Sequence, residues 1–139
     1  MDFEAPQDIG DTPGGTRRIL LMRRGHASGA FLCGQVLPGS GDWVLVRSDG
    51  VAQLDIRITL RTEDDALVHM RSWGLLEMSK ELRASILEGK TVAPSLYYFR
   101  TTLAFETAAE RYRWLNNVVA VGVGQRLATG MVTDVFVVR

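Results

Sequence analysis

Four polar side chains occur as two pairs with a spacing of two residues: Asp55 with Arg57, and Tyr98 with Arg100. In a β-strand, residues two apart project from the same face, so each pair presents its groups together. Arginine suits anion binding because its planar guanidinium donates several hydrogen bonds at fixed geometry. A carboxylate or a phenol beside it could move a proton. The pairs therefore indicate acid–base chemistry on a small oxygenated or aromatic molecule.

The pairs can be oriented in two ways. If Asp55 and Arg57 face water, they form a surface ion pair that contributes little to stability. If they face the inside of a barrel, they are a buried pair of charges, which is costly unless partners compensate. The functional hypothesis requires the second orientation, and it assigns Asp55, Arg57, Tyr98 and Arg100 as catalytic residues.

Four further residues are candidates for binding a ligand beside these pairs: Trp43, His69, Trp114 and Asn116. The tryptophan rings could form an aromatic wall, and the Asn116 amide could orient a carbonyl group. His69, facing the same interior, would be a natural general base near neutral pH. Each of these residues also fits a structural or solvent-exposed position.

The elements that must position these residues are mostly short β-strands. Residues 51–62 alternate between apolar and polar side chains, which is the period of a half-buried strand. The Asp49-Gly50 pair before them favours a hairpin turn. The other expected strands are residues 17–24, 31–37, 43–47, 66–73, 97–103, about 114–124 and 131–139.

One segment has helical periodicity instead. Ser79 can cap a helix, Leu82 and Ile86 lie four residues apart, and Gly89 stands where a helix would end. We expect one short helix over about residues 79–88. Eight short strands with turns every ~8–12 residues predict an all-β fold, an antiparallel barrel of about eight strands.

The length of 139 residues fits one domain. Residues 1–16 hold two of the four prolines and the pair Gly14-Gly15, which predicts a loosely ordered N-terminal arm. Residues 17–139 are then a single β-barrel domain. An eight-stranded barrel is either filled by side chains or holds one small ligand, so the state of its interior decides the function.

Composition excludes several classes of protein. Sixteen basic residues balance sixteen acidic ones, so no overall field attracts nucleic acid or an anionic membrane. No apolar run approaches the ~20 residues of a membrane-spanning helix, and the acidic first residues do not resemble a signal peptide. The single cysteine, Cys33, excludes an internal disulfide. We expect a cytoplasmic protein without nucleic-acid or membrane partners.

Motifs for metals and cofactors are missing. The sequence has one cysteine, Cys33, and only two histidines, His26 and His69. These are too few for a zinc site made of cysteines and histidines, so the sequence predicts no metal site. The glycines of residues 122–130 connect two strands and cannot open the helix that dinucleotide binding requires. There is no Gly-x-Ser-x-Gly elbow. The expected chemistry therefore needs no cofactor.

Three long blocks of the sequence resemble a known family: GDWVLVRSDGVAQLDIRITLRT, SLYYFRTTLAFET and RYRWLNN. They are similar to the bacterial and fungal domain of unknown function 3237 family, and the resemblance extends from about Asp11 to the C-terminus. It implies a small β-barrel and little about activity. The sequence departs from the family pattern at Asp64-Asp65, where Asp-Gly is common, and at His26, in a usually glycine-rich segment.

Three functions fit this pattern. The first is a cofactor-independent acid–base enzyme, an isomerase, cyclase, hydratase or lyase, acting on a small molecule. The second is a non-catalytic carrier or sensor of a similar ligand. The third is a structural or interaction protein with a filled barrel. The expected partner is a small-molecule ligand, and a homodimer is possible on this pattern.

Overall fold

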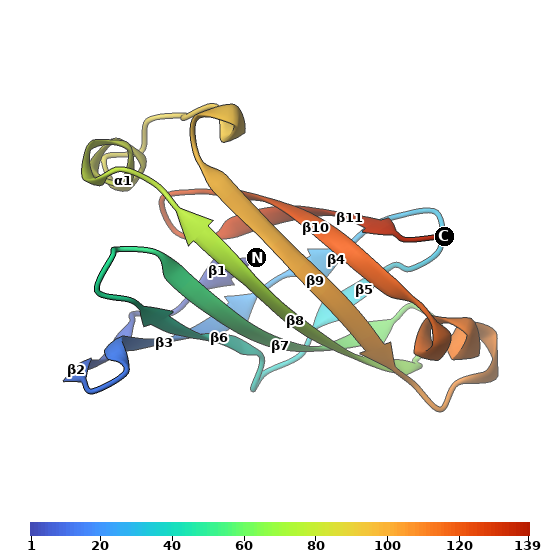
Figure 1. Ribbon diagram of the computed structural model, residues 1–139. Helices are drawn as coiled ribbons and strands as arrows, with labels where there is room; N and C mark the ends of the chain where they lie inside the picture. The colour runs from blue at the N-terminus through green and yellow to red at the C-terminus, as the bar shows by residue number, and fades with distance from the viewer.

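The computed structural model describes residues 1–139, and all strand pairings within its sheet are antiparallel (Figure 1). The main path of the sheet has the strand order β1-β3-β6-β7-β8-β9-β10-β11, with β2 on β3 and the β4–β5 pair on β7. The predicted all-β fold with about eight strands in one antiparallel sheet is therefore confirmed. The strands are β1 (Asp2–Phe3), β2 (Gln7–Thr12), β3 (Gly15–Arg24), β4 (His26–Ala27), β5 (Gly34–Val36), β6 (Gly41–Val46), β7 (Ala52–Thr62), β8 (Leu67–Glu77), β9 (Tyr98–Glu106), β10 (Val119–Arg126) and β11 (Met131–Val137).

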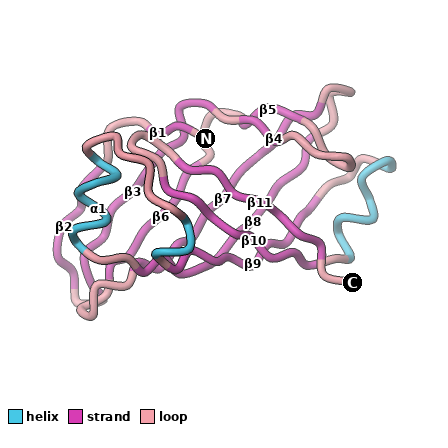
Figure 2. Tube along the Cα trace, turned by 90° about the horizontal axis from the view of Figure 1, so that it is seen from above, coloured by secondary structure: helices cyan, strands magenta, loops and turns pink.

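The sheet curls into a half-barrel around one apolar core (Figures 1 and 2). Its seam is closed at one end, where β1 meets the turn between β10 and β11. The Phe3 N–H donates to the Thr129 carbonyl, and the Met131 N–H donates to the Met1 carbonyl, both at 2.9 Å. Gly130 allows this approach, because a Cβ there would lie 2.0 Å from the Met1 carbonyl oxygen.

The alternation of β7 decides which face is inside. Its apolar side chains and Thr62 are buried, while the polar residues between them are half-buried or exposed. Burying apolar surface is the main favourable term in folding, so the apolar set takes the interior and the charged set faces outward. The buried side chains of this strand are Ala52, Leu54, Ile56, Ile58, Leu60 and Thr62.

The prediction of a loosely ordered arm over residues 1–16 is wrong. β1 pairs with β3, and β2 forms a hairpin with β3 around the two-residue turn Pro13-Gly14. Thr16 donates its hydroxyl hydrogen to Asp11 at 2.6 Å, which ties the two strands of the hairpin. The proline and glycine that indicated disorder therefore form a tight turn.

The predicted helix is confirmed as α1 (Lys80–Leu87). Ser79 is its N-cap and accepts a hydrogen bond from the Leu82 N–H, and Gly89 follows with a positive φ of 83°.

Two 3₁₀ segments, η1 (Pro94–Leu96) and η2 (Glu110–Asn117), complete the fold. The α1 helix and η2 lie at opposite ends of the half-barrel (Figures 1 and 2). Since η2 includes Trp114, the strand predicted to start there begins instead at Val119. Among these helical segments, none has both the length and the apolarity needed to cross a bilayer.

Candidate functional site

The first predicted catalytic pair lies on the outer surface of the sheet. The side chains of Asp55 and Arg57 are 31% and 52% exposed and form an ion pair at 2.9 Å. Arg71 approaches the same carboxylate at 4.0 Å, and the Arg57 guanidinium lies over the ring of Trp43 at 5.7 Å. The prediction that Asp55 and Arg57 face the interior is wrong, because the apolar face of β7 occupies it.

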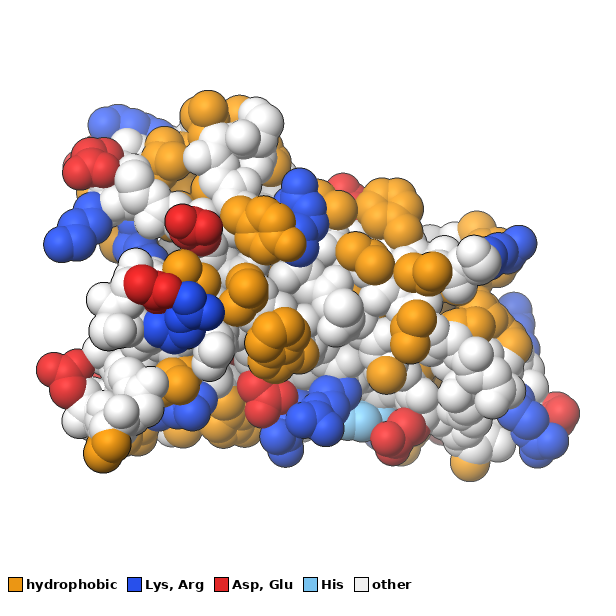
Figure 3. Space-filling model, viewed as in Figure 1, with side chains coloured by type: hydrophobic (Ala, Val, Ile, Leu, Met, Phe, Trp, Pro, Cys, Tyr) orange, Lys and Arg blue, Asp and Glu red, His pale blue; other side chains and the backbone are white.

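The second pair has the same orientation. Tyr98 is 51% exposed, and the Arg100 guanidinium lies over its ring at 5.5 Å. Arg100 also donates to the carbonyl of Phe99 at 2.9 Å, while the Phe99 side chain is only 1% exposed and points into the core. Tyr98 and Arg100 therefore do not line the interior. Figure 3 shows exposed hydrophobic and charged side chains together on the face formed by β7, β8 and β9.

The predicted ligand-binding residues also lie outside the barrel and do not form one site. Trp43 is on the outer face of β6, beneath Arg57. Trp114 in η2 is 38% exposed and packs edge-on against Phe31, with ring centroids 5.9 Å apart. The structure therefore places these two tryptophans in separate surface contacts rather than in one aromatic wall.

Asn116 and His69 do come together, but on the surface. They line the same open groove, beside Glu106. The Asn116 amide is occupied by Thr107, because its oxygen accepts from the Thr107 N–H at 2.8 Å and its nitrogen donates to the Thr107 carbonyl at 2.9 Å. Asn116 thus closes a loop, and its amide does not point into the barrel.

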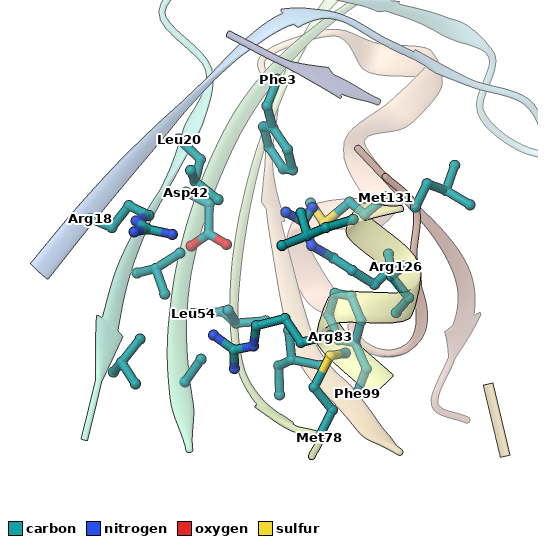
Figure 4. A pocket seen from close by; sticks show the side chains of 17 residues that line it. Phe3, Arg18, Leu20, Asp42, Leu54, Met78, Arg83, Phe99, Arg126 and Met131 are labelled. Atoms are coloured by element: carbon teal, nitrogen blue, oxygen red, sulfur yellow. The ribbon is translucent and has the colours of Figure 1, made fainter. Parts of the chain in front are cut away.

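A different set of residues lines a cavity inside the barrel at the α1 end (Figure 4). The cavity has a volume of about 120 Å³, close to the ~150 Å³ of an engineered protein cavity that holds benzene. Thirteen of its 17 lining residues are hydrophobic, and the four others are Arg18, Asp42, Arg83 and Arg126. An apolar cavity with a few converging polar groups has the composition of a small-molecule site.

Asp42 is the acidic group of this cavity. It lies on β6 between Leu20 of β3 and Ile56 of β7, is 2% exposed, and points its carboxylate into the space between the strands (Figure 4). Its Oδ1 accepts a hydrogen bond from the Asp55 N–H at 3.1 Å, and it forms no salt bridge. Burial raises the pKa of Asp42 to about 7, against the smaller lowering effects of this hydrogen bond and of Arg126.

A gap in the strand pairing makes room for this hydrogen bond. The paired residues of β6 and β7 skip from Asp42↔Ile56 to Leu45↔Gln53. The Asp55 N–H lies within that gap and donates to the Asp42 side chain. The carboxylate is therefore held by the sheet through the backbone of Asp55.

Arg126, the last residue of β10, provides the cation opposite Asp42. It donates to the Gly130 carbonyl at 2.8 Å, and its guanidinium lies over the ring of Phe3 at 5.2 Å. Its backbone N–H donates to the hydroxyl of Tyr97 at 2.9 Å. Burial lowers the pKa of Arg126 below its usual value while the charge of Asp42 acts to raise it, and an arginine so far above neutrality stays protonated.

A surface groove forms the outer part of the site. It has a volume of about 790 Å³ and runs beside α1, over residues of β8 and β9. The groove and the inner cavity share four lining residues: Val46, Met78, Arg83 and Leu87. A ligand larger than the cavity can therefore place its remainder in the groove.

Together, these groups can bind and deprotonate a small molecule. A carboxyl with a pKa near neutrality can both take and return a proton. A buried guanidinium can hold the oxyanion that forms when the proton leaves. The apolar walls exclude water and strengthen both interactions.

Sequence reasoning missed both residues. For Asp42 a signal exists, because it alternates in phase with Val44, which is buried, and Val46, which is half-buried, and such a position on a strand marks the interior. For Arg126 the signal is weak. It stands in the glycine-rich stretch 122–130, and its orientation depends on contacts with Phe3 and Gly130 that the local sequence does not show.

A curled antiparallel sheet around a lined cavity defines a small β-barrel protein. Residues 1–138 match the family described as "Protein of unknown function (DUF3237)", and the chain belongs to this family. The family resemblance seen in the sequence is thus confirmed. A UPF0311 protein of Clostridium acetobutylicum is 34% identical over 113 residues, which cover 81% of this chain and 72% of the relative.

Solved structures share the fold. A β-barrel-like protein from Acinetobacter baumannii has a TM-score of 0.84 at 36% identity, over 99% of this chain and 89% of that one. A structure described as an enzyme from Penicillium herquei has a TM-score of 0.70 at 16% identity, over 99% and 88% of the two chains. The second similarity concerns the fold alone.

Proposed function

We propose that the protein is a cofactor-independent acid–base enzyme that binds a small oxygenated or aromatic molecule in the inner cavity. The reaction class is isomerisation, cyclisation, hydration or elimination, in which a proton leaves one atom of the substrate and returns to another. Neither the β-barrel fold nor the family, whose function is unknown, specifies a reaction. The proposal therefore depends on the residues of the site.

One observation carries the proposal: Asp42 is buried without an ion-pair partner and faces Arg126 across a cavity whose lining is hydrophobic apart from these two residues, Arg18 and Arg83. Burying an unpaired carboxyl destabilises a fold. A structural role would be served equally well by an apolar side chain. An active site, in contrast, needs an acid whose pKa lies close to the working pH.

Each residue has a definite role in the proposal. Asp42 accepts a proton from an acidic C–H or O–H group of the substrate and later returns it. Arg126 binds the resulting enolate or phenolate oxygen through its guanidinium hydrogens. Leu20, Leu54 and Phe99 pack against the apolar part of the substrate and keep water out.

A carrier or sensor is the second candidate, and the apolar lining favours it. Such a protein would bind the same ligands without moving a proton.

We also propose a cytoplasmic location, which the free cysteine Cys33 supports because disulfides are rare in the cytoplasm.

Deuterium exchange separates enzyme from carrier. The probe is 4-hydroxyacetophenone in D₂O, whose single ring suits the cavity and whose methyl ketone can be enolised. The wild-type protein should accelerate loss of the methyl proton signal in NMR spectra. Asp42→Asn should abolish the acceleration, and the control Asp55→Asn, on the outer face, should retain it. Binding without accelerated exchange would favour the carrier, and equal exchange in both variants would refute the role of Asp42.

A further inference from the structure

We propose that the substrate is a monocyclic organic anion whose carboxylate is held by Arg83 at the mouth of the cavity, while its reacting group extends inward to Asp42. This inference rests on the proposed function and specifies the substrate class for that site. Three observations carry it: the position of Arg83, the charge balance of the cavity, and the volume of the inner cavity.

Arg83 stands at the boundary between the two compartments. It lies on α1 and is half-buried, and it lines both the inner cavity and the outer groove. The three other residues that line both are the apolar Val46, Met78 and Leu87. Arg83 is therefore the one charged residue that lines both compartments. Figure 4 shows its guanidinium extending across the cavity below Asp42.

The charge of Arg83 is not neutralised by the protein, since it forms no salt bridge. Arg18, an exposed residue that also lines the cavity, pairs with Asp8. In the groove, Asp49 pairs with Arg47, and the exposed Glu77 forms no salt bridge with Arg83. A bound anion would thus find an unoccupied guanidinium at the cavity mouth.

The cavity as a whole has more positive than negative charge. After the Arg18–Asp8 pair is set aside, Arg83 and Arg126 face the single carboxyl of Asp42. The two guanidinium charges repel each other, and the charge of Arg83 acts to lower the pKa of Arg126. A substrate carboxylate at Arg83 relieves this repulsion and leaves Arg126 free for the oxyanion of the reaction.

The volume of the inner cavity limits the part of the substrate that it can hold. About 120 Å³ admits one six-membered ring. The fork of a single guanidinium matches a carboxylate, with two parallel hydrogen bonds. A ring with a carboxylate on one side and a hydroxyl or enolisable carbon on the other fits this arrangement.

The test compares two probes of nearly equal size, 4-hydroxybenzoate and the neutral 4-hydroxybenzamide, by isothermal titration calorimetry at pH 7.5. The wild-type protein should bind the benzoate at least tenfold more tightly than the benzamide. Arg83→Leu should remove this preference with little change in affinity for the benzamide, and Arg83→Lys should keep part of it. Lys90→Leu, which removes a cation just beyond the same helix and outside both compartments, is the matched control and should keep all of it.

Several outcomes would overturn the inference. Equal affinities in the wild-type protein, a preference that survives Arg83→Leu, or no binding of either probe each contradicts it. The Asp42→Asn and Arg126→Leu variants separate this failure from failure of the proposed function. If both variants weaken binding of the two probes but no preference for the benzoate exists, the inner site stands and the role of Arg83 is wrong. If neither variant affects binding while Arg83→Leu removes the preference, the anion site stands and the proposed function is wrong.

Discussion

The backbone N–H of Asp55 donates a hydrogen bond to Oδ1 of Asp42 at 3.1 Å, inside the gap in pairing between β6 and β7. The two aspartates therefore have opposite environments although they lie on adjacent strands. The Asp55 carboxylate is on the outer face, paired with Arg57, and the Asp42 carboxylate is enclosed. Asp55 contributes to the candidate site through its main chain, whatever its side chain does outside.

The pH dependence of stability should report the burial of Asp42. The pKa of Asp42 is about 7 in the folded protein, against 3.8 as the ordinary value of an aspartate, so the folded state holds the proton more tightly. The stabilisation of the folded state that comes from this protonated carboxyl is fully present below pH ~4 and is lost as the pH rises from ~4 through ~7. Above that range the buried charge costs on the order of 4 kcal/mol. Urea unfolding at pH 8 should therefore show Asp42→Asn to be more stable than the wild-type protein, with the difference disappearing near pH 4.

The matched control for this measurement is Asp55→Asn, which should show no such gain at pH 8. A wild-type protein and an Asp42→Asn variant of equal stability across the whole pH range would mean that the carboxyl is not buried as described.

The outward arginines should be dispensable for the ligand. Arg57→Ala removes an exposed ion pair with Asp55, and Arg100→Ala removes a contact with the exposed ring of Tyr98. The melting temperature should be almost unchanged in both, since such exposed contacts contribute little. Affinity for 4-hydroxybenzoate should stay within about twofold, a difference of ~0.4 kcal/mol. Calorimetry checks both variants, and a large loss of affinity in either one would move the binding site to the outer face.

Much of the fold follows from local patterns, and the orientation of the site does not. The alternation of residues 51–62 and the capping residues around Ser79 predict β7 and α1 correctly. Applied consistently, the same alternation would have put the apolar face of β7 inside and Asp55 outside. The hypothesis that the charged groups line the lumen contradicts that simpler interpretation.

Other parts of the site depend on contacts between distant segments. β1 has only two residues, and nothing in Asp2–Phe3 indicates that it pairs with residues near Gly130. Arg126 is placed by Phe3, Tyr97 and Gly130, which lie on different elements. Such contacts exist only once the sheet has curled, and a single sequence does not show the curl.

Closure of the seam should depend on Gly130. A side chain at this position would place its Cβ 2.0 Å from the Met1 carbonyl oxygen, so β1 must move away in Gly130→Ala. Loss of the hydrogen bonds at the seam should lower the free energy of unfolding by about 1–3 kcal/mol and disturb Arg126. Gly29→Ala is the control, because its Cβ would make an ordinary contact at 3.7 Å. Denaturant unfolding of both variants tests this, and an unchanged Gly130→Ala protein would contradict the closure.

Two buried threonines should respond oppositely to the same substitution. The Thr101 hydroxyl is buried and has no hydrogen-bond partner, so Thr101→Val should raise the free energy of unfolding by about 1 kcal/mol. The Thr62 hydroxyl donates to Asp64 at 2.6 Å and accepts from the Ala66 N–H at 2.9 Å. Thr62→Val should lower the free energy of unfolding by about 1–2 kcal/mol. Urea denaturation decides, and a destabilised Thr101→Val variant would show that its hydroxyl has a partner.

The most direct test of the central claim is the pH profile of deuterium exchange into 4-hydroxyacetophenone. If Asp42 is the base, the protein-catalysed rate at low probe concentration should rise with pH and level off above ~7, following the pKa of Asp42. The catalysed rate should be absent from Asp42→Asn at every pH and should keep the wild-type profile in Asp55→Asn. A catalysed rate that is the same in the wild-type protein and in Asp42→Asn, or the absence of any catalysed exchange despite binding, would contradict the account.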